Sequence, residues 1–244
     1  MENDLSELLE RVEFCRQKTD ELQGRITQLA GKSISHWLFP WGSPGVGEIK
    51  ATLLAHPPVS LRQEVGMIVN EQRAILDALA CTLATRNGAN HTNDVYFPIT
   101  KTKEGFFQRG QDKIRKISFT DQQTIEAIKP WAPSDDNPED GNLVLFQLHD
   151  ADRVRKHQNL LKWACLGGVY PAGNGHIGMM TTEMVVFQDV GKEEVLAFFS
   201  GVTCGLAVQF EIVYAEPASL DGHAVRPLLS RFTDIVDEVV RSFA

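Results

Sequence analysis

The chain of 244 residues contains few cysteines, and they lie far apart. They occur at Cys15, Cys81, Cys165 and Cys204. No C-x-x-C pair is present, so the spacing predicts neither a zinc ribbon nor a disulfide framework. We expect reduced, buried thiols.

An excess of positive charge is also missing. The chain has 24 Lys and Arg against 32 Asp and Glu, which gives a formal net charge of -8. Proteins that bind nucleic acids or anionic membranes in general usually neutralise phosphates with surplus Lys and Arg. The balance argues against such a general binder and leaves room only for a local basic patch.

Long apolar runs are absent as well. The longest uncharged stretch, residues 195–210, falls short of the roughly 18 to 20 apolar residues that span a bilayer, and it indicates buried strands instead. The opening residues, MENDLSELLERVEF, carry acids where a signal peptide needs basic residues. We therefore expect a soluble, cytoplasmic protein with no membrane segment.

What the sequence does contain is helical periodicity. A 43% hydrophobic and 23% charged composition is typical of a globular protein with a sizeable core. Apolar residues between Leu5 and Leu29 follow heptad spacing over nearly four heptads, which predicts a long helix with one narrow seam. The seam packs either on another helix of this chain or on a second copy in a homodimer, and packing within the chain is favoured.

Residues 33–59 are rich in Pro and Gly and are predicted to form a connector. A capping box at Ser60–Gln63 then opens a second long helix that ends near Arg86. On this helix Asn70, Arg73 and Asp77 share a polar stripe beside a continuous apolar one.

The remaining pattern predicts further helices and then strands. Helices are expected over residues 103–117, from residue 120 to before Pro130, over 142–164 and over 225–243, and short strands over 182–187, 195–199 and 206–214. The predicted fold class is α+β, a mainly helical bundle with a small antiparallel sheet near the C-terminus. The predicted parts are a helix over 1–32, the connector, and one compact domain over 60–244.

Polar groups on the helix of residues 142–164 form a second candidate cluster. Asp152 and Lys156 lie one turn apart, and His149 and His157 share a face with Arg153. The two histidines are about 12 Å apart along a helix, so they cannot bind one zinc ion. We expect no metal site and no cofactor.

Two further motifs have ordinary interpretations. The G-x-G-x-x-G at Gly173–Gly178 follows Pro171 and precedes strand-like residues, which favours a loop between strands over a dinucleotide site. The basic residues of 101–116 surround two phenylalanines and form the best local nucleic-acid patch, although a solvated helix face is favoured. They are Lys101, Lys103, Arg109, Lys113, Arg115 and Lys116.

Several segments together resemble an uncharacterised bacterial family of conserved proteins. Residues 57–84 resemble the family helix G-[DE]-h-h-H-N-L-R-S-A-L-D-H-L, where h is apolar, with matches at Gly66, Arg73, Leu76, Asp77 and Leu79. YFPI at 96–99 resembles the family's F-P-I segment, and IEAIKPW at 125–131 resembles its I-x-x-L-Q-P-Y. LHDADRVRKHQNLL at 148–161 resembles its D-K-H-R segment. The similarity covers roughly residues 55 to 243.

The resemblance implies that the two long helices face each other, with Arg73 and Asp77 near Lys156 and His157. The spacing R-x-x-x-x-H in that family resembles, more remotely, the motif of HEPN ribonucleases, in which Arg and His act on RNA. Here Ala78 replaces that His, and Asn70-Glu71 replace the family's His-Asn. Cleavage of RNA through this motif would need His157 to act from the other helix.

Three functional hypotheses follow. The first is a binding or interaction module, not an enzyme, in which Arg73, Asp77, Lys156 and His157 form a structural network. The second is an HEPN-type protein that binds or cleaves RNA, in bacterial defence, with Arg73, Asp77 and His157 as catalytic candidates. Its candidate binding residues are Asn70, Asp152, Lys156, Lys113, Arg115 and Lys116. The third is a small-molecule hydrolase with a pocket joining His157 to Asp77 or Asp152.

Overall fold

The structure is a computed structural model that describes residues 5–158, 161–182, 184–187 and 189–244, without the side chains of residues 30, 157 and 158. Contacts between residues divide the chain into two compact units. We call residues 1–21, 63–161 and 226–244 the helical unit, and residues 22–62 and 162–225 the β unit.

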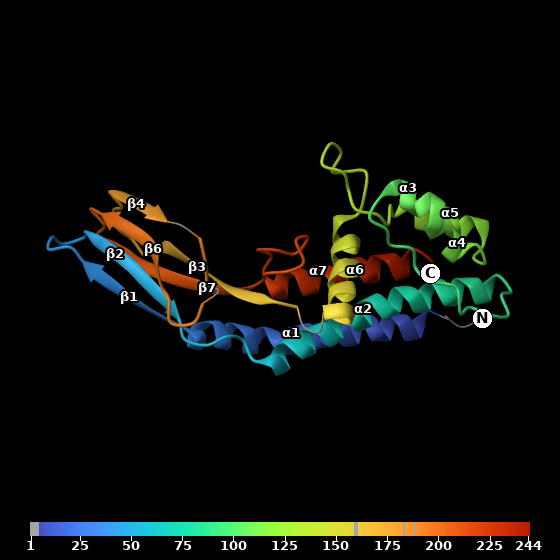
Figure 1. The fold of residues 1–244 in the computed structure, drawn as a ribbon, viewed down its shortest axis with the longest axis horizontal. Coiled ribbons are helices and arrows are strands. Elements are labelled where there is room, and N and C mark those ends of the chain that lie inside the picture. The colour runs from blue at the N-terminus through green and yellow to red at the C-terminus, as the bar shows by residue number, and fades with distance from the viewer. Residues whose placement is uncertain (1–4, 159–160, 183, 188) are drawn as a thin grey trace. The chain divides into compact units, whose positions relative to one another are not determined.

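The helices follow the sequence periodicity closely (Figure 1). They are α1 (Ser6–Ser33), α2 (Val59–Arg86), α3 (Lys103–Gly105), the π-helix η1 (Phe106–Gly110), α4 (Gln111–Ile114), α5 (Phe119–Ala127), α6 (Leu143–Gln158) and α7 (Val225–Arg241). The segments α3, η1 and α4 follow one another without a break and correspond to the helix predicted over residues 103–117. Each predicted helix has a counterpart in the structure, although the one predicted over 142–164 is shorter than expected.

The heptad seam of α1 is used within the chain. The seam residues that are at most 6% exposed are Leu5, Leu8, Val12, Cys15, Thr19, Leu22 and Ile26. In the helical unit, Arg11 pairs with Glu71 of α2 at 2.7 Å and Arg16 pairs with Asp234 of α7 at 2.7 Å. Burial of these residues within one chain favours intrachain packing of the seam over a homodimer through it.

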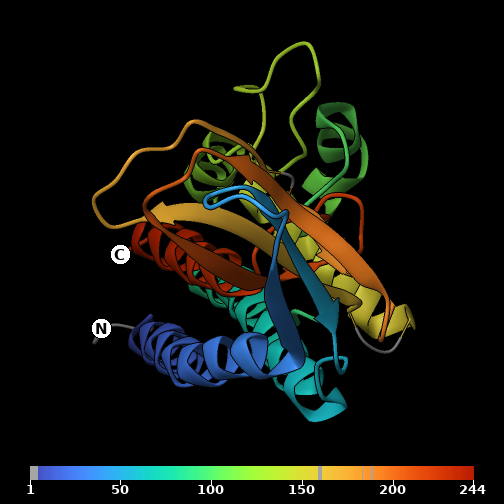
Figure 2. The same ribbon diagram turned by 90° about the vertical axis from the view of Figure 1, so that its left-hand side faces the viewer.

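The β unit contains two antiparallel sheets (Figures 1 and 2). The four-stranded sheet has the order β1 (Ile34–Pro40), β2 (Gly47–Leu53), β6 (Glu193–Ser200) and β4 (Met179–Thr182). The three-stranded sheet has the order β5 (Val185–Phe187), β3 (Trp163–Ala172) and β7 (Gly205–Tyr214). Strand β6 contacts β3 and β5 of the other sheet, while β1 and β7 are edge strands.

The fold class α+β is confirmed, but several details of the prediction were wrong. The connector over 33–59 contains the hairpin β1–β2, the β structure is not confined to the C-terminal part, and the chain divides into two units instead of one. The helix predicted over 142–164 ends at Gln158, because Trp163 and Ala164 pair with Tyr214 and Val213 in a sheet. The run 182–187 is divided between β4 and β5.

Turn residues explain the error in the connector. Gly42 and Gly45 have φ values of +69° and +72°, which only glycine adopts without strain, and they lie in the turn between β1 and β2. Pro57 and Pro58 instead precede α2. The Pro and Gly residues thus mark the two ends of a hairpin and not one continuous loop.

None of the helices among the described residues is long and apolar enough to span a bilayer.

Candidate functional site

Asn70, on the polar stripe of α2, contacts α6. Asn70 Nδ2 donates to Asp152 Oδ1 over 3.1 Å, and Lys156 Nζ lies 2.6 Å from Asp152 Oδ2. The Asp152 side chain is only 5% exposed. A buried carboxylate needs such partners, because an unpaired one would cost several kcal/mol. These contacts join two helices that are far apart in the sequence.

Arg73 and Asp77 hold the segment that follows α2. Arg73 Nη2 donates to the carbonyl of Phe97 over 2.8 Å, and Asp77 Oδ1 accepts from the Phe97 backbone N–H over 3.0 Å. Arg73 Nη1 also lies 2.8 Å from Asp77 Oδ1, but without hydrogen-bond geometry, so that contact is an ion pair. The two side chains satisfy both backbone polar groups of one residue, Phe97, and Arg73 is 7% exposed.

His149 is the histidine whose electrostatic environment includes Arg73. Burial, and then the nearby positive charge of Arg73, lower the pKa of His149 to about 4, although Asp152 and Asp150 oppose the shift. His149 is therefore neutral at neutral pH. The neutral His149 ring lies near Arg73, whose guanidinium donates to the Phe97 carbonyl. This arrangement indicates a structural role for both side chains.

The catalytic hypothesis depends on His157, whose side chain is outside the described part of the chain. His157 lies in α6. Lys156, one residue earlier, pairs with Asp152, whereas Arg73 and Asp77 contact Phe97. Among the described contacts, Arg73 and Asp77 thus meet the loop after α2 and not Lys156.

The predicted basic patch carries its own counter-charges. Lys116 and Arg115 both pair with Asp94, and the Lys116 hydrogen bond is the main reason that the pKa of Asp94 is lowered to about 2. Lys113 lies 5.6 Å from the ring centroid of Tyr96, in a cation–π contact. These pairings reduce the positive charge available for phosphates. In the part of the chain that the structure describes, three or more potential metal ligands do not gather anywhere.

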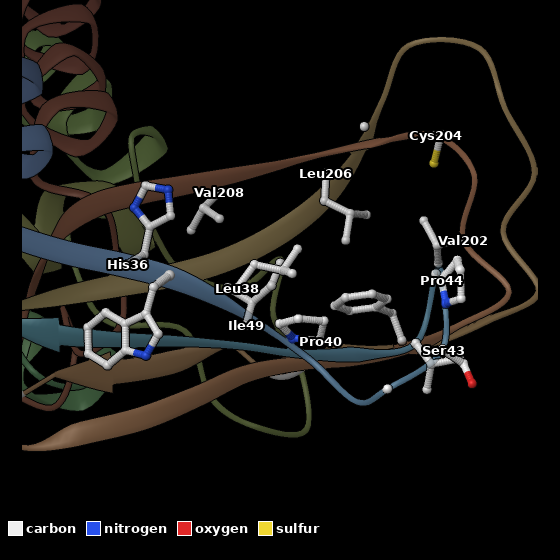
Figure 3. Close-up of a pocket in the computed structure, with 16 residues that line it drawn as sticks. His36, Leu38, Pro40, Ser43, Pro44, Ile49, Val202, Cys204, Leu206 and Val208 are labelled. Carbon is white, nitrogen blue, oxygen red and sulfur yellow. The ribbon is translucent and has the colours of Figure 1, made fainter.

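A large hollow lies in the β unit instead. It is a groove of about 870 Å³ between β1 of one sheet and β7 of the other (Figure 3). His36 and Leu38 line one side, and Leu206 and Val208 line the other. None of its described lining residues is Asp, Glu, Lys or Arg.

The tip of the β1–β2 hairpin closes one end of the groove. The Val202 N–H donates to the Gly45 carbonyl over 3.2 Å, and a Cβ on Gly45 would lie 2.6 Å from the Val202 oxygen. Only glycine permits this approach. The loop of Val202 and Cys204 is thereby joined to the hairpin, as Figure 3 shows.

Comparisons with known proteins give no relative. No family model, no curated protein and no solved structure matches the chain.

Sequence reasoning missed the groove because it missed the hairpin. In β2, Gly47, Ile49, Ala51 and Leu53 are buried, and the residues between them are partly exposed. This alternation over seven residues is a readable strand signal. The same face of β1 carries His36, Leu38 and Pro40 opposite Ala51, Ile49 and Gly47, so the inward residues of the hairpin could have been assigned from that pattern.

Proposed function

We propose that the protein is a non-catalytic binding module whose β unit holds an extended, uncharged polypeptide segment in the groove between β1 and β7. Two features support this. Both flanking strands are sheet edges, which offer unpaired backbone N–H and C=O groups. The lining between them is apolar and uncharged. A peptide that adds a strand matches both features, because its backbone pairs with the sheet edge and its alternate side chains enter the apolar groove.

The length of the edge sets the length of the segment. Strand β1 has seven residues, and at about 3.3 Å per residue it offers an edge roughly 23 Å long. His36, Leu38 and Pro40 alternate toward the groove along it. We expect the bound segment to present small or branched apolar side chains at every second position.

In this proposal the helical unit is a bundle that serves as a scaffold. Arg73 and Asp77 bind the backbone of Phe97, and Asp152 binds Asn70 and Lys156. Because these groups already have structural partners, they favour a fixed framework over acid–base chemistry. Membership of the uncharacterised family and a cytoplasmic location remain parts of the proposal.

RNA binding has less support as the function. Ala78 takes the place of the HEPN histidine, and Arg115 and Lys116 pair with Asp94. A test is fluorescence anisotropy with labelled mixed RNA at rising salt. Tight binding that weakens steeply with salt would favour the RNA function and contradict the proposal.

Peptide anisotropy tests the groove directly. The probe is a labelled octapeptide of alternating Val and Thr, and the comparison peptide has Lys at two of the Val positions. We expect the uncharged peptide to bind the protein, and Val208→Lys to weaken it about tenfold or more because a charge would enter an apolar groove. Gln209→Lys is the matched control, since Gln209 is exposed and neighbours on a strand point to opposite faces. Equal binding by both variants would contradict the proposal.

A further inference from the structure

Strand β1 exposes apolar side chains on both of its faces. Leu38 on the groove side is 53% exposed, and Phe39 on the outer side is 44% exposed. The strand, ISHWLFP, contains no Asp, Glu, Lys or Arg. Natural edge strands usually carry charges that prevent pairing, whereas strands covered on both faces are continuous apolar runs. By composition β1 resembles an interior strand, yet within one chain it is an edge.

The hydrogen bonds at the two ends of the hairpin show which backbone groups are free. Leu54 N–H donates to the Ser33 carbonyl over 2.7 Å, and Trp41 N–H donates to the Val46 carbonyl over 2.9 Å. Antiparallel pairs alternate between bonded and non-bonded residues, so the odd-numbered residues of β1 bond to β2. The N–H groups of Ile34, His36 and Leu38 therefore point to the free edge. Pro40 also falls on that side and has no N–H, so a strand added there forms one hydrogen bond fewer at Pro40.

We infer that the segment held in the groove is β1 of a second copy of this chain, paired antiparallel with β1 about a two-fold axis at Trp37. The inference rests on the proposed function, namely that the groove accepts an extended segment. In this register Ile34 lies opposite Pro40 of the second copy, so all seven residues overlap. A register shifted toward the start of β1 would bring the hairpin turn against helix α1, which ends at Ser33 directly before the strand.

The same register matches side chains on both faces. His36 lies opposite Leu38 of the second copy on the groove side, and Trp37 lies opposite Trp37 on the outer side. Aromatic pairs at directly opposed positions stabilise sheets, and no like charges meet because the strand has none. The join makes one sheet of eight strands from two four-stranded sheets.

The residues around the free edge come close in number to one side of a standard interface. The groove has 16 lining residues, and the exposed Phe39 and Phe198 lie on the outer face of the sheet, each in register with Glu48. The ring of Trp41 lies 5.7 Å from that of Phe198, measured between centroids. A standard interface uses about 20 to 30 residues on each side. The other sheet edges fit less well, because β4 has four residues, β5 has three, and β7 carries Glu211.

Cysteine cross-linking tests the register. In Trp37→Cys the two sulfurs face each other across the axis, at Cα atoms about 4.5 Å apart in a non-bonded pair, which a disulfide can join. Phe39→Cys is the matched control on the same face, because its two copies would be about 13 Å apart. We expect a covalent dimer under mild oxidation from the first variant and not from the second. Equal cross-linking by the two, or none by the first, would overturn the inference.

Sedimentation with a backbone variant tests the edge itself. His36→Pro removes an N–H that points to the free edge and leaves the bonds to β2 intact, while His36→Ala removes the side chain and keeps the N–H. We expect the unaltered protein to be a dimer at micromolar concentration, and His36→Ala measures the effect of losing the side chain alone, against which His36→Pro is compared. His36→Pro should raise the dimer Kd by about tenfold or more. Circular dichroism checks that both variants fold. Ser35→Pro removes a hydrogen bond to β2 and provides the reference spectrum of a chain with a disrupted hairpin.

The two proposals fail in different ways. If the unaltered protein is a monomer that still binds the Val-Thr peptide, the second copy is excluded and the groove function stands. If it is a dimer that His36→Pro does not weaken, the dimer uses another surface and the inference is overturned. If it is a monomer that binds no peptide, both proposals are wrong.

Discussion

The two units of this chain differ in the kind of side chain that they bury and the kind that they expose. In the helical unit, charged side chains such as Arg73 and Asp152 are buried and each has found a partner. In the β unit, apolar side chains such as Leu38 and Trp41 are exposed, and the strand that carries them has a free edge. The helical unit pairs its buried charges within the chain, whereas the β unit leaves apolar side chains exposed on an edge strand.

This difference predicts where substitutions act. Removing a partner in the helical unit leaves a buried polar group without compensation, so the cost appears in the free energy of unfolding. Removing an exposed apolar side chain in the β unit leaves little behind in the free protein, so the cost appears in binding. The comparison fails if both regions respond in the same way.

Arg73→Met should give the largest loss of stability. Met has similar length but leaves the Phe97 carbonyl without its donor and Asp77 without its cation. We expect the free energy of unfolding to fall by about 3 to 5 kcal/mol, the range for breaking one side of a buried pair. Urea unfolding followed by circular dichroism measures it.

An exposed ion pair provides the control for that result. Arg115 pairs with Asp94 over 3.2 Å, but the Arg115 side chain is 67% exposed. Arg115→Met should change the free energy of unfolding by about 0.5 kcal/mol or less. If Arg73→Met cost no more than this, the network would not be structural and the contrast between the units would be lost.

Acid should destabilise the helical unit through His149. Burial lowers the pKa of His149 in the folded chain to about 4, whereas an unfolded histidine has a pKa of about 6.5. The unfolded state therefore binds the proton first, so stability is complete above pH 6.5 and falls as the pH drops toward 4. The expected loss is about 2 kcal/mol, after allowing for the partial exposure of the ring.

His149→Gln isolates this contribution, since carboxylates also titrate in that range. The difference in unfolding free energy between the unaltered protein and the variant should shrink as the pH is lowered from 7 to 4. A constant difference would mean that His149 is not held neutral by the fold. The same pair of proteins should show no such change in peptide binding by the β unit.

The helices could be predicted because their information is local. Heptad spacing in α1 and the capping box before α2 depend on residues within one or two turns of each other. The facing of α2 and α6 was reached only through the family resemblance, because the contact of Asn70 with Asp152 joins residues 82 positions apart. The local sequence pattern did not indicate that Phe97 would be the partner of both Arg73 and Asp77.

The groove could not be predicted for a related reason. Its two sides come from residues near 38 and near 206, and no local rule states that these edges lie together. The hairpin was within reach, since β2 alternates regularly, but the prolines and glycines around it were given more weight. Apolar residues on both faces of β1 indicate an interior strand, and that signal becomes informative only once the strand is known to be an edge.

Two facing residues of the hairpin give the smallest expected effect and the finest test. Leu38 and Ile49 are cross-strand partners on the groove face, but Leu38 is 53% exposed and Ile49 is 3% exposed. Leu38→Gln should change the free energy of unfolding by about 0.5 kcal/mol or less. It should nevertheless weaken binding of the Val-Thr peptide, because Leu38 lines the groove.

Ile49→Gln is the opposite case on the same face. Burying its amide without a partner should cost about 1 to 3 kcal/mol on top of the lost apolar contact. Urea titration of both variants, with anisotropy on the one that stays folded, separates the two effects. If Leu38→Gln destabilised the free protein as much as Ile49→Gln, the free chain would already bury Leu38, and the groove would not be open to a partner.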